Sequence, residues 1–306
     1  MPETTELTPP FEKTYYYDGR KDRLMVTAMH NDSIHALKDF EVRDDDVYIV
    51  TYPKAGTTFI LEIVDAIMHR GNIDEIKGKR MEDKLNLIEL GPAPGIEIAT
   101  YKKVSTWKSP RQIQTHLPVD LMPPQVFTKK PRIILVTRNP RDCCISLHAW
   151  HATVKFLEPC DWDYLVDRFV EGQVIWGCWF EHLADWINKM GGKDNFLHLK
   201  YEDIKEDRQG ASETVANFLG YDLNPDEMKR VVDHTDFNNM KEYMKTVTQR
   251  DVFLRENRHW QRKGIVGDWK SNFTVAQDEK FKEWEQRKCK EYGIDFMQYY
   301  TKTPKK

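Results

Sequence analysis

The sequence contains no long hydrophobic run and few cysteines for its length. No segment approaches the roughly 20 consecutive apolar residues that span a bilayer, and the polar, acidic residues 1–13 contain no apolar signal core. The 5 cysteines are an odd number without metal-ligand spacing, which fits free thiols in a reducing compartment. We therefore expect a cytoplasmic protein with no membrane partner and no metal site.

An excess of positive charge is also missing. The 306 residues include 46 Lys and Arg against 49 Asp and Glu, for a formal net charge of −3. Because a general nucleic-acid binder is usually basic, we expect no nucleic-acid partner. Any anion site must therefore be a local cluster of cations on a mildly acidic chain. The apolar share of 40% is enough to form the core of one large α/β domain or of two small ones.

The most informative segment is a short loop between two apolar runs. Residues 47–50 predict a buried strand and residues 60–68 predict a helix. The segment that joins them reads Thr51-Tyr52-Pro53-Lys54-Ala55-Gly56-Thr57-Thr58-Phe59. A helix N-terminus offers free backbone N–H groups and the positive end of the helix dipole. Because Lys54 adds a charge and Gly56 lets the backbone approach a ligand, the segment predicts a phosphate-binding loop.

This loop differs from the usual nucleoside-triphosphate loop. That loop ends in Gly-Lys-Ser/Thr, and its hydroxyl binds Mg²⁺. Here Lys54 precedes Gly56 by two residues, and no acidic metal ligand is evident. A kinase or another nucleotide phosphotransferase is therefore disfavoured. Taken alone, a loop with Pro and Gly could equally be a plain turn.

Further apolar runs predict a parallel sheet. Residues 133–136 and 196–199 are strand candidates. Helical patterns lie near Asp161–Lys189, Ala211–Leu219 and Asn224–His234. Strands that alternate with helices favour a parallel α/β sheet, in which ligands bind at the carboxyl ends of the strands. Since Lys54 and Arg138 both follow strand ends, we expect them to face one crevice.

These segments predict the fold class and the division of the chain. We expect a single α/β domain over residues 15–306, with a central, mainly parallel sheet flanked by helices and a P-loop-like loop that binds phosphate. Residues 1–14 would form a mobile N-terminal arm. A polar stretch that contains Gly and Pro extends over residues 71–110.

Two more cationic segments accompany the loop. Arg138-Asn139-Pro140-Arg141-Asp142 follows the second strand candidate, and Arg262-Lys263-Gly264-Ile265-Val266-Gly267-Asp268-Trp269-Lys270 lies near the C-terminus. Taken alone, the C-terminal segment is more simply a solvated surface turn. Together the three segments resemble the cytosolic sulfotransferase family, which transfers a sulfuryl group from 3′-phosphoadenosine 5′-phosphosulfate (PAPS). The resemblance extends from about Tyr17 to the C-terminus.

The resemblance implies a PAPS site built from the three segments. Lys54 and the backbone of the loop would hold the phosphosulfate end, and Arg138 with Ser146 would hold the 3′-phosphate through charge-assisted hydrogen bonds. Aromatic side chains would contact the adenine. The cofactor-binding residues implied in this way are Lys54, Ala55, Gly56, Thr57, Thr58, Phe59, Arg138, Ser146, Tyr201, Thr235, Phe237, Met240, Arg262, Lys263 and Gly264.

The resemblance also implies the catalytic residues. His116 is similar to the family's histidine, which takes the proton from an acceptor hydroxyl as that hydroxyl attacks sulfur. Lys54 would neutralise the leaving oxygen without a metal. Ser146 belongs both to the 3′-phosphate site and to the catalytic set. The reaction would be an in-line displacement that yields a sulfate ester and adenosine 3′,5′-bisphosphate.

The resemblance further implies that the acceptor would be a small lipophilic hydroxyl compound, and it leaves open whether this is a phenol, a steroid, a bile alcohol or another alcohol. Its site would include His116, Gln114 and Trp150, under a lid formed by residues 85–107, with a contribution from Tyr15 to Tyr17. Gln114 stands where many phenol-sulfating relatives have lysine. Two cofactor positions also depart from the family, since Ala55 replaces a common serine and Phe59 replaces tryptophan.

A last segment resembles the family's dimerisation motif, Lys-x-x-x-Thr-Val-x-x-x-Glu. The motif matches at Lys270, Thr274, Val275 and Glu279, and it predicts a homodimer. The simpler alternative is an ordinary turn before a helix. Two alternatives to sulfate transfer also stay open, namely a non-catalytic relative that binds a nucleotide or a lipophile, and a dehydratase-type variant whose sulfated intermediate eliminates.

Overall fold

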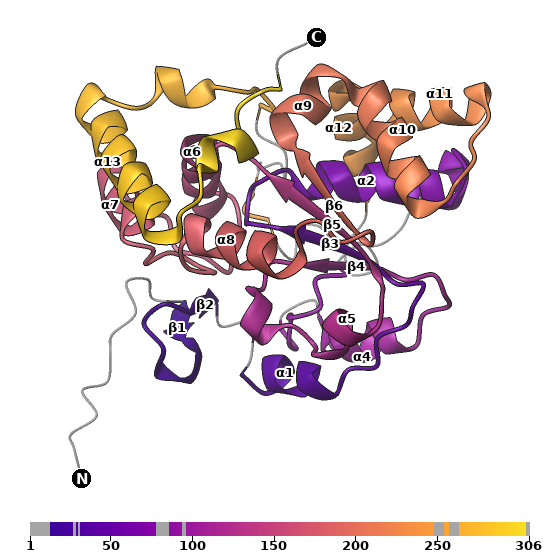
Figure 1. Cartoon of the computed structure of the whole chain (residues 1–306), viewed down its shortest axis with the longest axis horizontal. Helices are drawn as coiled ribbons and strands as arrows, with labels where there is room; N and C mark the ends of the chain where they lie inside the picture. Colours follow the sequence, from indigo (N-terminus) through magenta and orange to yellow (C-terminus); the bar gives the residue numbers. More distant parts are fainter. Residues whose placement is uncertain are drawn as a thin grey trace.

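The computed structural model describes residues 13–26, 29, 31–77, 86–93, 96–247, 254–256 and 263–303. Its centre is a four-stranded parallel sheet in the order β4-β3-β5-β6 (Figure 1). The strands are β3 (Val47–Thr51), β4 (Gln112–Thr115), β5 (Arg132–Thr137) and β6 (Phe196–Lys200). A small antiparallel hairpin stands apart, formed by β1 (Thr14–Tyr16) and β2 (Leu24–Val26). The parallel α/β fold predicted from the sequence is confirmed.

Strand β3 lies in the middle of the sheet. Its Ile49 pairs in register with Gln114 of β4 on one side and with Ile134 of β5 on the other. Every residue of β3 is buried, because helices cover both faces of the sheet. A strand buried on both faces reads as a continuous apolar run, and this explains why it was recognisable in the sequence.

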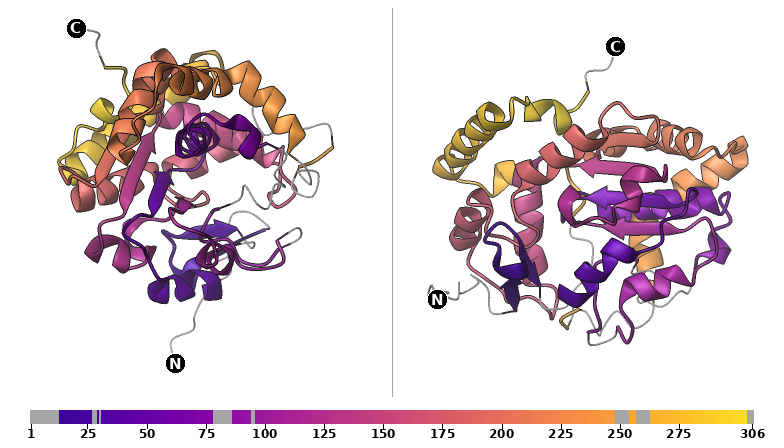
Figure 2. Two further views of the ribbon diagram at one scale, coloured as in Figure 1. Left: turned by 90° about the vertical axis from the view of Figure 1, so that its right-hand side faces the viewer. Right: turned by 60° about the horizontal axis from the view of Figure 1, so that its bottom comes forward.

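Helices pack on both faces of the sheet (Figures 1 and 2). Ile49 and Ile134 face a cluster formed with α2 (Thr57–Met68), α9 (Tyr201–Glu206), α10 (Arg208–Leu219), α11 (Pro225–His234) and α12 (Phe237–Thr246). Tyr48 and Leu135 face a larger cluster on the opposite side. That cluster includes residues of α1 (Asn31–Ala36), α4 (Thr100–Ser105), α5 (Gln125–Thr128), α6 (Pro140–His151), α7 (Trp162–Val170), α8 (Trp179–Met190) and α13 (Val275–Tyr292).

Short 3₁₀ helices connect these elements. They are η1 (Tyr17–Gly19), η2 (Leu37–Asp39), η3 (Ile73–Glu75), η4 (Val119–Leu121), η6 (Asp268–Ser271) and η7 (Phe296–Tyr299). Of the expected N-terminal arm, residues 1–12 lie outside the described part of the chain, and Thr14 belongs to β1. The arm and the boundary of the α/β domain therefore stay predictions.

One expectation about secondary structure was wrong, and one strand of the sheet was not predicted. The helical pattern near Asp161–Lys189 is two helices, because α7 ends at Val170 and Gly172 follows with a φ of 70°. A left-handed glycine just past a helix end is a common terminator. Strand β4 was not predicted, since it has only four residues and Gln112 and Gln114 interrupt its apolar character.

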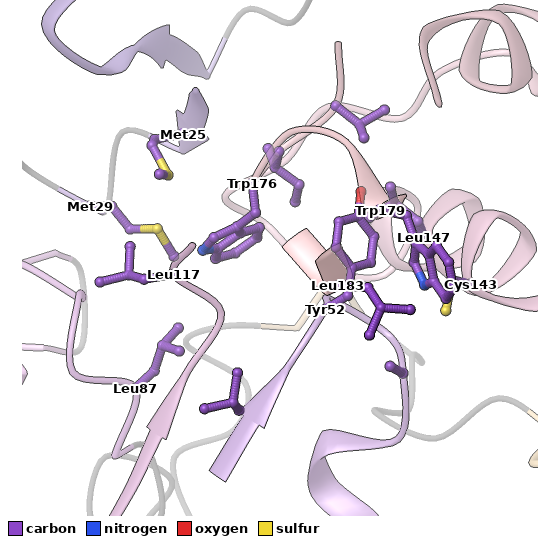
Figure 3. Packing of buried hydrophobic residues seen from close by; sticks show 14 of the residues in the cluster. Met25, Met29, Tyr52, Leu87, Leu117, Cys143, Leu147, Trp176, Trp179 and Leu183 are labelled. Atoms are coloured by element: carbon purple, nitrogen blue, oxygen red, sulfur yellow. The ribbon is translucent and has the colours of Figure 1, made fainter. Parts of the chain in front are cut away.

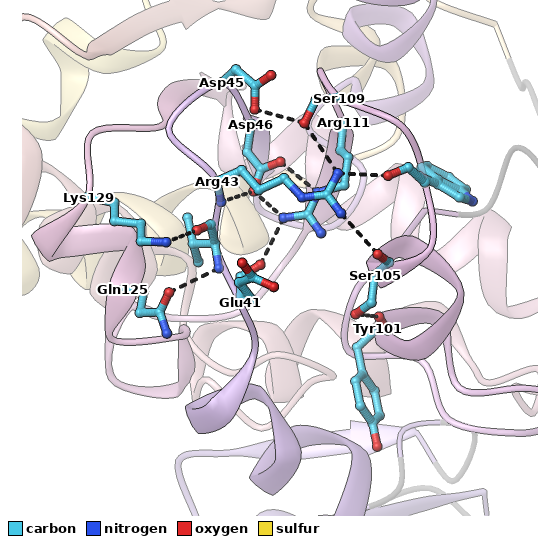
Figure 4. Close-up of polar contacts among 12 residues, drawn as sticks. Glu41, Arg43, Asp45, Asp46, Tyr101, Ser105, Ser109, Arg111, Gln125 and Lys129 are labelled. Atoms are coloured by element: carbon cyan, nitrogen blue, oxygen red, sulfur yellow. Dashed lines mark hydrogen bonds and ion pairs between the residues drawn. The ribbon is translucent and has the colours of Figure 1, made fainter.

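A buried ion pair joins the starts of two sheet strands (Figure 4). The Arg111 guanidinium donates to both carboxylate oxygens of Asp46, at 2.7 and 2.5 Å, and the two residues are 1% and 0% exposed. The N–H of Arg43 donates to Asp46 at 2.8 Å, and its guanidinium donates to the Trp107 carbonyl at 2.7 Å. These contacts hold the end of the expected lid, near Ser105, against the sheet.

Breaking this pair should strongly destabilise the fold. We expect Asp46→Ala to lower the free energy of unfolding by about 3–5 kcal/mol, because it leaves the Arg111 charge buried and unpaired. Urea-induced unfolding measures the change. In the matched control, Asp74→Ala removes an exposed ion pair with Lys77 and should leave the midpoint nearly unchanged. Equal small effects of both substitutions would contradict a structural role for the buried pair.

Candidate active site

The predicted phosphate loop lies at the carboxyl end of β3 and turns sharply into α2. Lys54 has a φ of 70° and Gly56 a φ of 103°. A Cβ atom at Gly56 would lie 2.5 Å from Cδ2 of Tyr201, so only glycine fits this close approach. The N–H of Ala55 donates to the Tyr52 carbonyl at 3.1 Å, which closes the turn. The first N–H groups of α2 are therefore available to donate hydrogen bonds to an anion.

Arg138 lies at the end of β5 and reaches the phosphate loop. Its guanidinium donates to the carbonyl of Lys54 and to the carbonyl of Ile265, each at 3.2 Å. It also lies 4.5 Å from the centre of the Tyr201 ring. The structure therefore brings Lys54 and Arg138 together, as their positions after strand ends predicted.

The C-terminal cationic loop is attached to the same place through Asp142. This carboxylate is fully buried and accepts the N–H of Gly267 at 2.7 Å and that of Trp269 at 3.0 Å. Lys263 donates to Asp268 at 3.1 Å. Arg262, which the sequence assigned to the nucleotide site, lies outside the described residues. Asp142 belongs to the cationic segment Arg138–Asp142, but the sequence did not predict that it attaches the C-terminal loop. The contacts of Asp142 with Gly267 and Trp269 join residues that are far apart in sequence.

Aromatic side chains gather beside the loop. The rings of Phe59 and Tyr201 lie edge to face with centroids 6.1 Å apart. A Cβ atom at Gly264 would lie 2.6 Å from the Phe237 ring, so the backbone of the C-terminal loop lies directly against this ring. Thr235 lies just before α12 and Met240 lies in the first turns of this helix. Both residues are buried. The residues expected around adenine therefore include three aromatic rings at one end of the sheet.

Lys205 belongs to the same group and was missed in the sequence. Its ammonium lies 5.5 Å from the Phe59 ring centre and 5.4 Å from that of Phe237. Burial lowers the pKa of Lys205. Its position four residues after Tyr201 on α9 was a usable signal, because residues four apart share a helix face.

His116 follows β4 and is held against the start of the phosphate loop. Its Nδ1 lies 2.7 Å from the carbonyl oxygen of Thr51. Because a carbonyl only accepts hydrogen bonds, Nδ1 carries the proton in the neutral ring and Nε2 keeps its lone pair. The amide nitrogen of Gln114 lies 3.3 Å from Nε2. Thr51 also joins this group to the loop, since its hydroxyl lies 2.7 Å from that of Thr57.

The neutral form of His116 is strongly favoured. Burial lowers the pKa of its ring to about 4, the hydrogen bond to the Thr51 backbone opposes this change, and the charge of Lys54 adds to it. A neutral imidazole with an unprotonated Nε2, which here accepts a hydrogen bond from the Gln114 amide, is the form that accepts a proton.

Two tryptophans lie beside His116 and Lys54. The Lys54 ammonium lies 4.7 Å from the centre of the Trp150 ring. Trp176 stands edge to face with His116 at 5.0 Å and lies 6.5 Å from Trp150. Figure 3 shows Trp176 among buried residues of the larger cluster, with Met29 and Leu117 beside it. Trp176 was missed because it lies in the irregular segment between α7 and α8, where no periodicity marks it.

Other predicted residues lie around this space. Ser146 is on α6, one helical turn before Trp150, and it is partly exposed. The β1–β2 hairpin approaches Trp176, whose N–H donates to the Leu24 carbonyl at 2.8 Å. The Tyr15 hydroxyl donates to the Met29 carbonyl. In the expected lid, residues 86–93 and 96–107 are described and the rest lie outside the described part.

The expected dimerisation motif lies on the surface at the start of α13. Thr274 caps this helix through a capping box with Gln277. Val275 is 77% exposed, and Lys270 and Glu279 are exposed as well. The segment thus comprises the end of the 3₁₀ helix η6, a short turn and the start of α13, and it presents an apolar side chain to solvent.

A parallel α/β sheet whose phosphate loop, arginine and aromatic rings converge on a buried neutral histidine is the arrangement of a nucleotide-dependent group-transfer enzyme. Comparison with known proteins identifies the family. A family model described as "Sulfotransferase domain" matches residues 44–293. The chain belongs to the sulfotransferase family, as its motifs predicted.

Individual relatives are similar over most of their length. Sulfotransferase 1C2 of Homo sapiens is 34% identical over 269 residues, which cover 87% of this chain and 90% of the relative. Sulfotransferase 2A2 of Rattus norvegicus is 36% identical over 253 residues, which cover 81% of this chain and 85% of the relative.

Solved structures share the fold. Mouse sulfotransferase SULT7A1, crystallised with PAP, superposes with a TM-score of 0.76 at 27% identity and covers 91% of this chain and 94% of its own. Retinol dehydratase, solved with androsterone and the inactive cofactor PAP, has a TM-score of 0.78 at 22% identity over 90% of this chain and 89% of its own, and it supports the fold alone.

The described ranges contain neither a candidate membrane span nor a candidate metal cluster. None of their helices combines the length and the apolar character needed to cross a membrane. No three His, Cys, Asp or Glu side chains in the same ranges are arranged to hold a metal ion.

The pKa of His116 can be measured directly. In the protein without ligands we expect the ring to titrate near pH 4 and not near 6.5, because burial disfavours its charged form. The unfolded chain binds this proton near pH 6.5, so His116 should reduce the stability of the fold progressively as the pH falls from 6.5 to about 4. Ring NMR spectra measure the titration, and His116→Gln assigns the signal. Titration near 6.5 would show an exposed ring.

Proposed function

We propose that this sulfotransferase moves the sulfuryl group of PAPS in line to the hydroxyl of a small lipophilic acceptor. The products are a sulfate ester and adenosine 3′,5′-bisphosphate (PAP). PAPS as donor is supported by mouse SULT7A1, a relative of the same fold that was crystallised with PAP. The observation that carries the proposal is His116, whose Nδ1–H is bound to Thr51 and whose neutral Nε2 lies beside Gln114.

The nucleotide site follows from the three converging segments. The first N–H groups of α2, from Gly56 to Thr58, and the Lys54 ammonium bind the phosphosulfate end. Arg138 binds the 3′-phosphate, with Ser146 and the segment Lys263–Gly264. The adenine contacts Phe59, Tyr201 and Phe237, whose rings and the neighbouring Thr235 and Met240 lie at the same end of the sheet. Planar guanidinium groups and backbone amides suit phosphate oxygens because several donors point in one direction.

His116 acts as the general base and Lys54 as the group that stabilises the leaving oxygen. A base needs its lone pair at the operating pH, and burial with a hydrogen-bonded Nδ1 gives His116 this state. The Lys54 ammonium lies over the Trp150 ring, a favourable place for a cation that must reach a developing anion. The Trp150 ring, which we assign to the acceptor site, therefore contacts Lys54, the residue that stabilises the leaving oxygen.

The acceptor binds between Trp150, Trp176 and His116. Flat aromatic walls and a single hydroxyl-binding position at His116 and Gln114 suit a phenol, a steroid, a bile alcohol or another lipophilic alcohol. A non-catalytic relative is not favoured, because Lys54 and His116 are both present and close to the nucleotide segments. The likeness to retinol dehydratase supports the fold only and adds nothing for the elimination variant.

A homodimer through Lys270, Thr274, Val275 and Glu279 remains part of the proposal. It is supported by the exposed apolar side chain of Val275 at a helix start. The cytoplasmic location expected from the sequence stays a prediction.

The test of the function is transfer of radiolabelled sulfate from PAPS to a panel of phenols, steroids, bile alcohols and aliphatic alcohols. A labelled product establishes the activity and gives the acceptor class. PAP binding without a product from any acceptor would favour the non-catalytic relative. A desulfated, dehydrated product would favour elimination.

Removing the base should abolish turnover and spare the nucleotide site. We expect His116→Ala to lower kcat by at least about 10²–10⁴-fold, the usual contribution of a general base, while PAP affinity stays nearly constant. Initial rates and calorimetric PAP titration measure the two quantities. His35→Ala, at an exposed histidine paired with Asp18, is the control and should change neither. Strong residual activity of His116→Ala would remove this residue from the role of base.

Replacing Arg138, unlike replacing His116, should weaken the binding of PAP. We expect Arg138→Ala to weaken PAP binding by about 1.5–3 kcal/mol, the range for a hydrogen bond to a charged group. Arg132→Ala is the matched control, because Arg132 lies at the opposite end of the same strand and contacts the Phe218 carbonyl. Equal PAP affinity of the wild type and Arg138→Ala would place the 3′-phosphate elsewhere.

A further inference from the structure

The start of the expected lid is an extension of the central sheet. Leu87 forms a parallel bridge with Gln114, the N–H of Ile88 donates to the Gln114 carbonyl at 3.0 Å, and Gln114 donates back to Asn86 at 3.0 Å. Residues 86–88 therefore pair with β4 at the open edge of the sheet. The next residue, Glu89, lies where this pairing reaches His116.

The Glu89 carboxylate contacts both His116 and the acceptor wall. It is fully buried, and its Oε1 accepts the backbone N–H of His116 at 2.8 Å. The same oxygen accepts the indole N–H of Trp176 at 3.3 Å. Oε1 of Glu89 therefore binds both the backbone of His116, the proposed base, and the indole of Trp176. The centres of the His116 and Trp176 rings lie 5.0 Å apart.

Burying the Glu89 carboxylate costs the fold free energy of desolvation. Its Oε2 is buried without a hydrogen-bond partner, and none of the ion pairs among the described residues involves Glu89. Burial raises its pKa to about 7, against the hydrogen bonds from the His116 backbone and from Trp176 that favour the charged form. An apolar side chain of similar size would avoid the desolvation cost. The contacts that Glu89 makes point to a role at the site.

We propose that Glu89 is a positioning residue that couples the lid over the acceptor to the catalytic His116 and to Trp176. The inference rests on the proposed function. Thr51 holds the His116 ring at Nδ1, and Glu89 holds the His116 backbone, so the two contacts together fix where Nε2 lies. A lid displaced by a missing or badly fitting acceptor moves the carboxylate and with it the base.

The coupling makes alignment of the base depend on the acceptor. A displacement of about 1 Å in a reacting group can cost roughly 10²-fold in rate. An acceptor that fills the space beside Trp176 holds the lid residues in place and keeps Nε2 aligned. Glu89 is therefore expected to affect kcat and the acceptor KM, and not the binding of PAP, because its hydrogen bonds within the described part of the chain go to His116 and Trp176.

Two substitutions separate positioning from folding. Glu89→Gln keeps an amide oxygen that can accept from both His116 and Trp176, so its kcat should stay within about 5-fold of the wild type. Glu89→Leu keeps the volume and removes the acceptor atom, so its kcat should fall at least about 10²-fold. PAP affinity, measured by calorimetry, should change less than about 3-fold in either variant. Glu213→Leu, at an exposed residue of α10 away from the lid, is the control and should leave both kcat and PAP affinity unchanged.

The outcomes distinguish the coupling from the function itself. Wild-type kcat in Glu89→Leu would overturn the coupling and leave the sulfotransferase intact. Loss of PAP binding together with kcat would mean that Glu89 serves the whole fold, which also overturns it. A wild type that binds PAP but sulfates no acceptor would instead be a failure of the proposed function.

A measurement on the wild type covers the case in which Glu89→Leu does not fold. In NMR spectra of the PAP complex, the amide signal of His116 and the indole N–H signal of Trp176 should shift together when an acceptor is added. Independent or absent shifts would overturn the coupling without any variant.

Discussion

The hydrogen bond from His116 to the carbonyl oxygen of Thr51 is the interaction on which the site depends. It joins the end of β4 to the end of β3, where the phosphate loop begins. In a parallel sheet all carboxyl ends lie at one edge, so this bond places the proposed base beside the proposed anion loop without any further element. It also fixes the tautomer, because the carbonyl oxygen can only accept a hydrogen bond and Nδ1 must therefore carry the hydrogen.

Burial is the second constraint on the site, because it shifts the pKa values of an acid, a base and a cation there. His116 is kept neutral by desolvation, the Glu89 carboxylate is pushed toward its neutral form, and Lys205 is held between aromatic rings. Each of these groups costs stability in the absence of ligands. A site that must stabilise charge only in the transition state benefits from such dry surroundings, because its dipoles and charges act there at low dielectric. The buried pair of Asp46 and Arg111 shows the other use of charge, since it links strand starts far from the chemistry.

How far the fold could be predicted depended on how continuous each apolar run was. Strand β3 was recognisable because it is buried on both faces, and α10 and α11 kept a helical period to their ends. Strand β4 escaped notice because glutamines interrupt it, and its place in the sheet comes from pairing with β3. The break between α7 and α8 was missed because the apolar period continues across a left-handed turn. Backbone conformation at single residues overrides periodicity in such cases.

By itself the sequence determined the family, the order of the nucleotide segments and the candidate residues Lys54, Arg138 and His116, because short motifs combine local backbone geometry with a required charge. The tertiary structure alone decided which distant residues support them. Asp142 attaches the C-terminal loop, Lys205 joins the aromatic cluster, and Glu89 with Trp176 surrounds the base. Contacts of this kind depend on which elements pack together in three dimensions, and apart from the helical spacing of Tyr201 and Lys205 no local pattern of residue types records them.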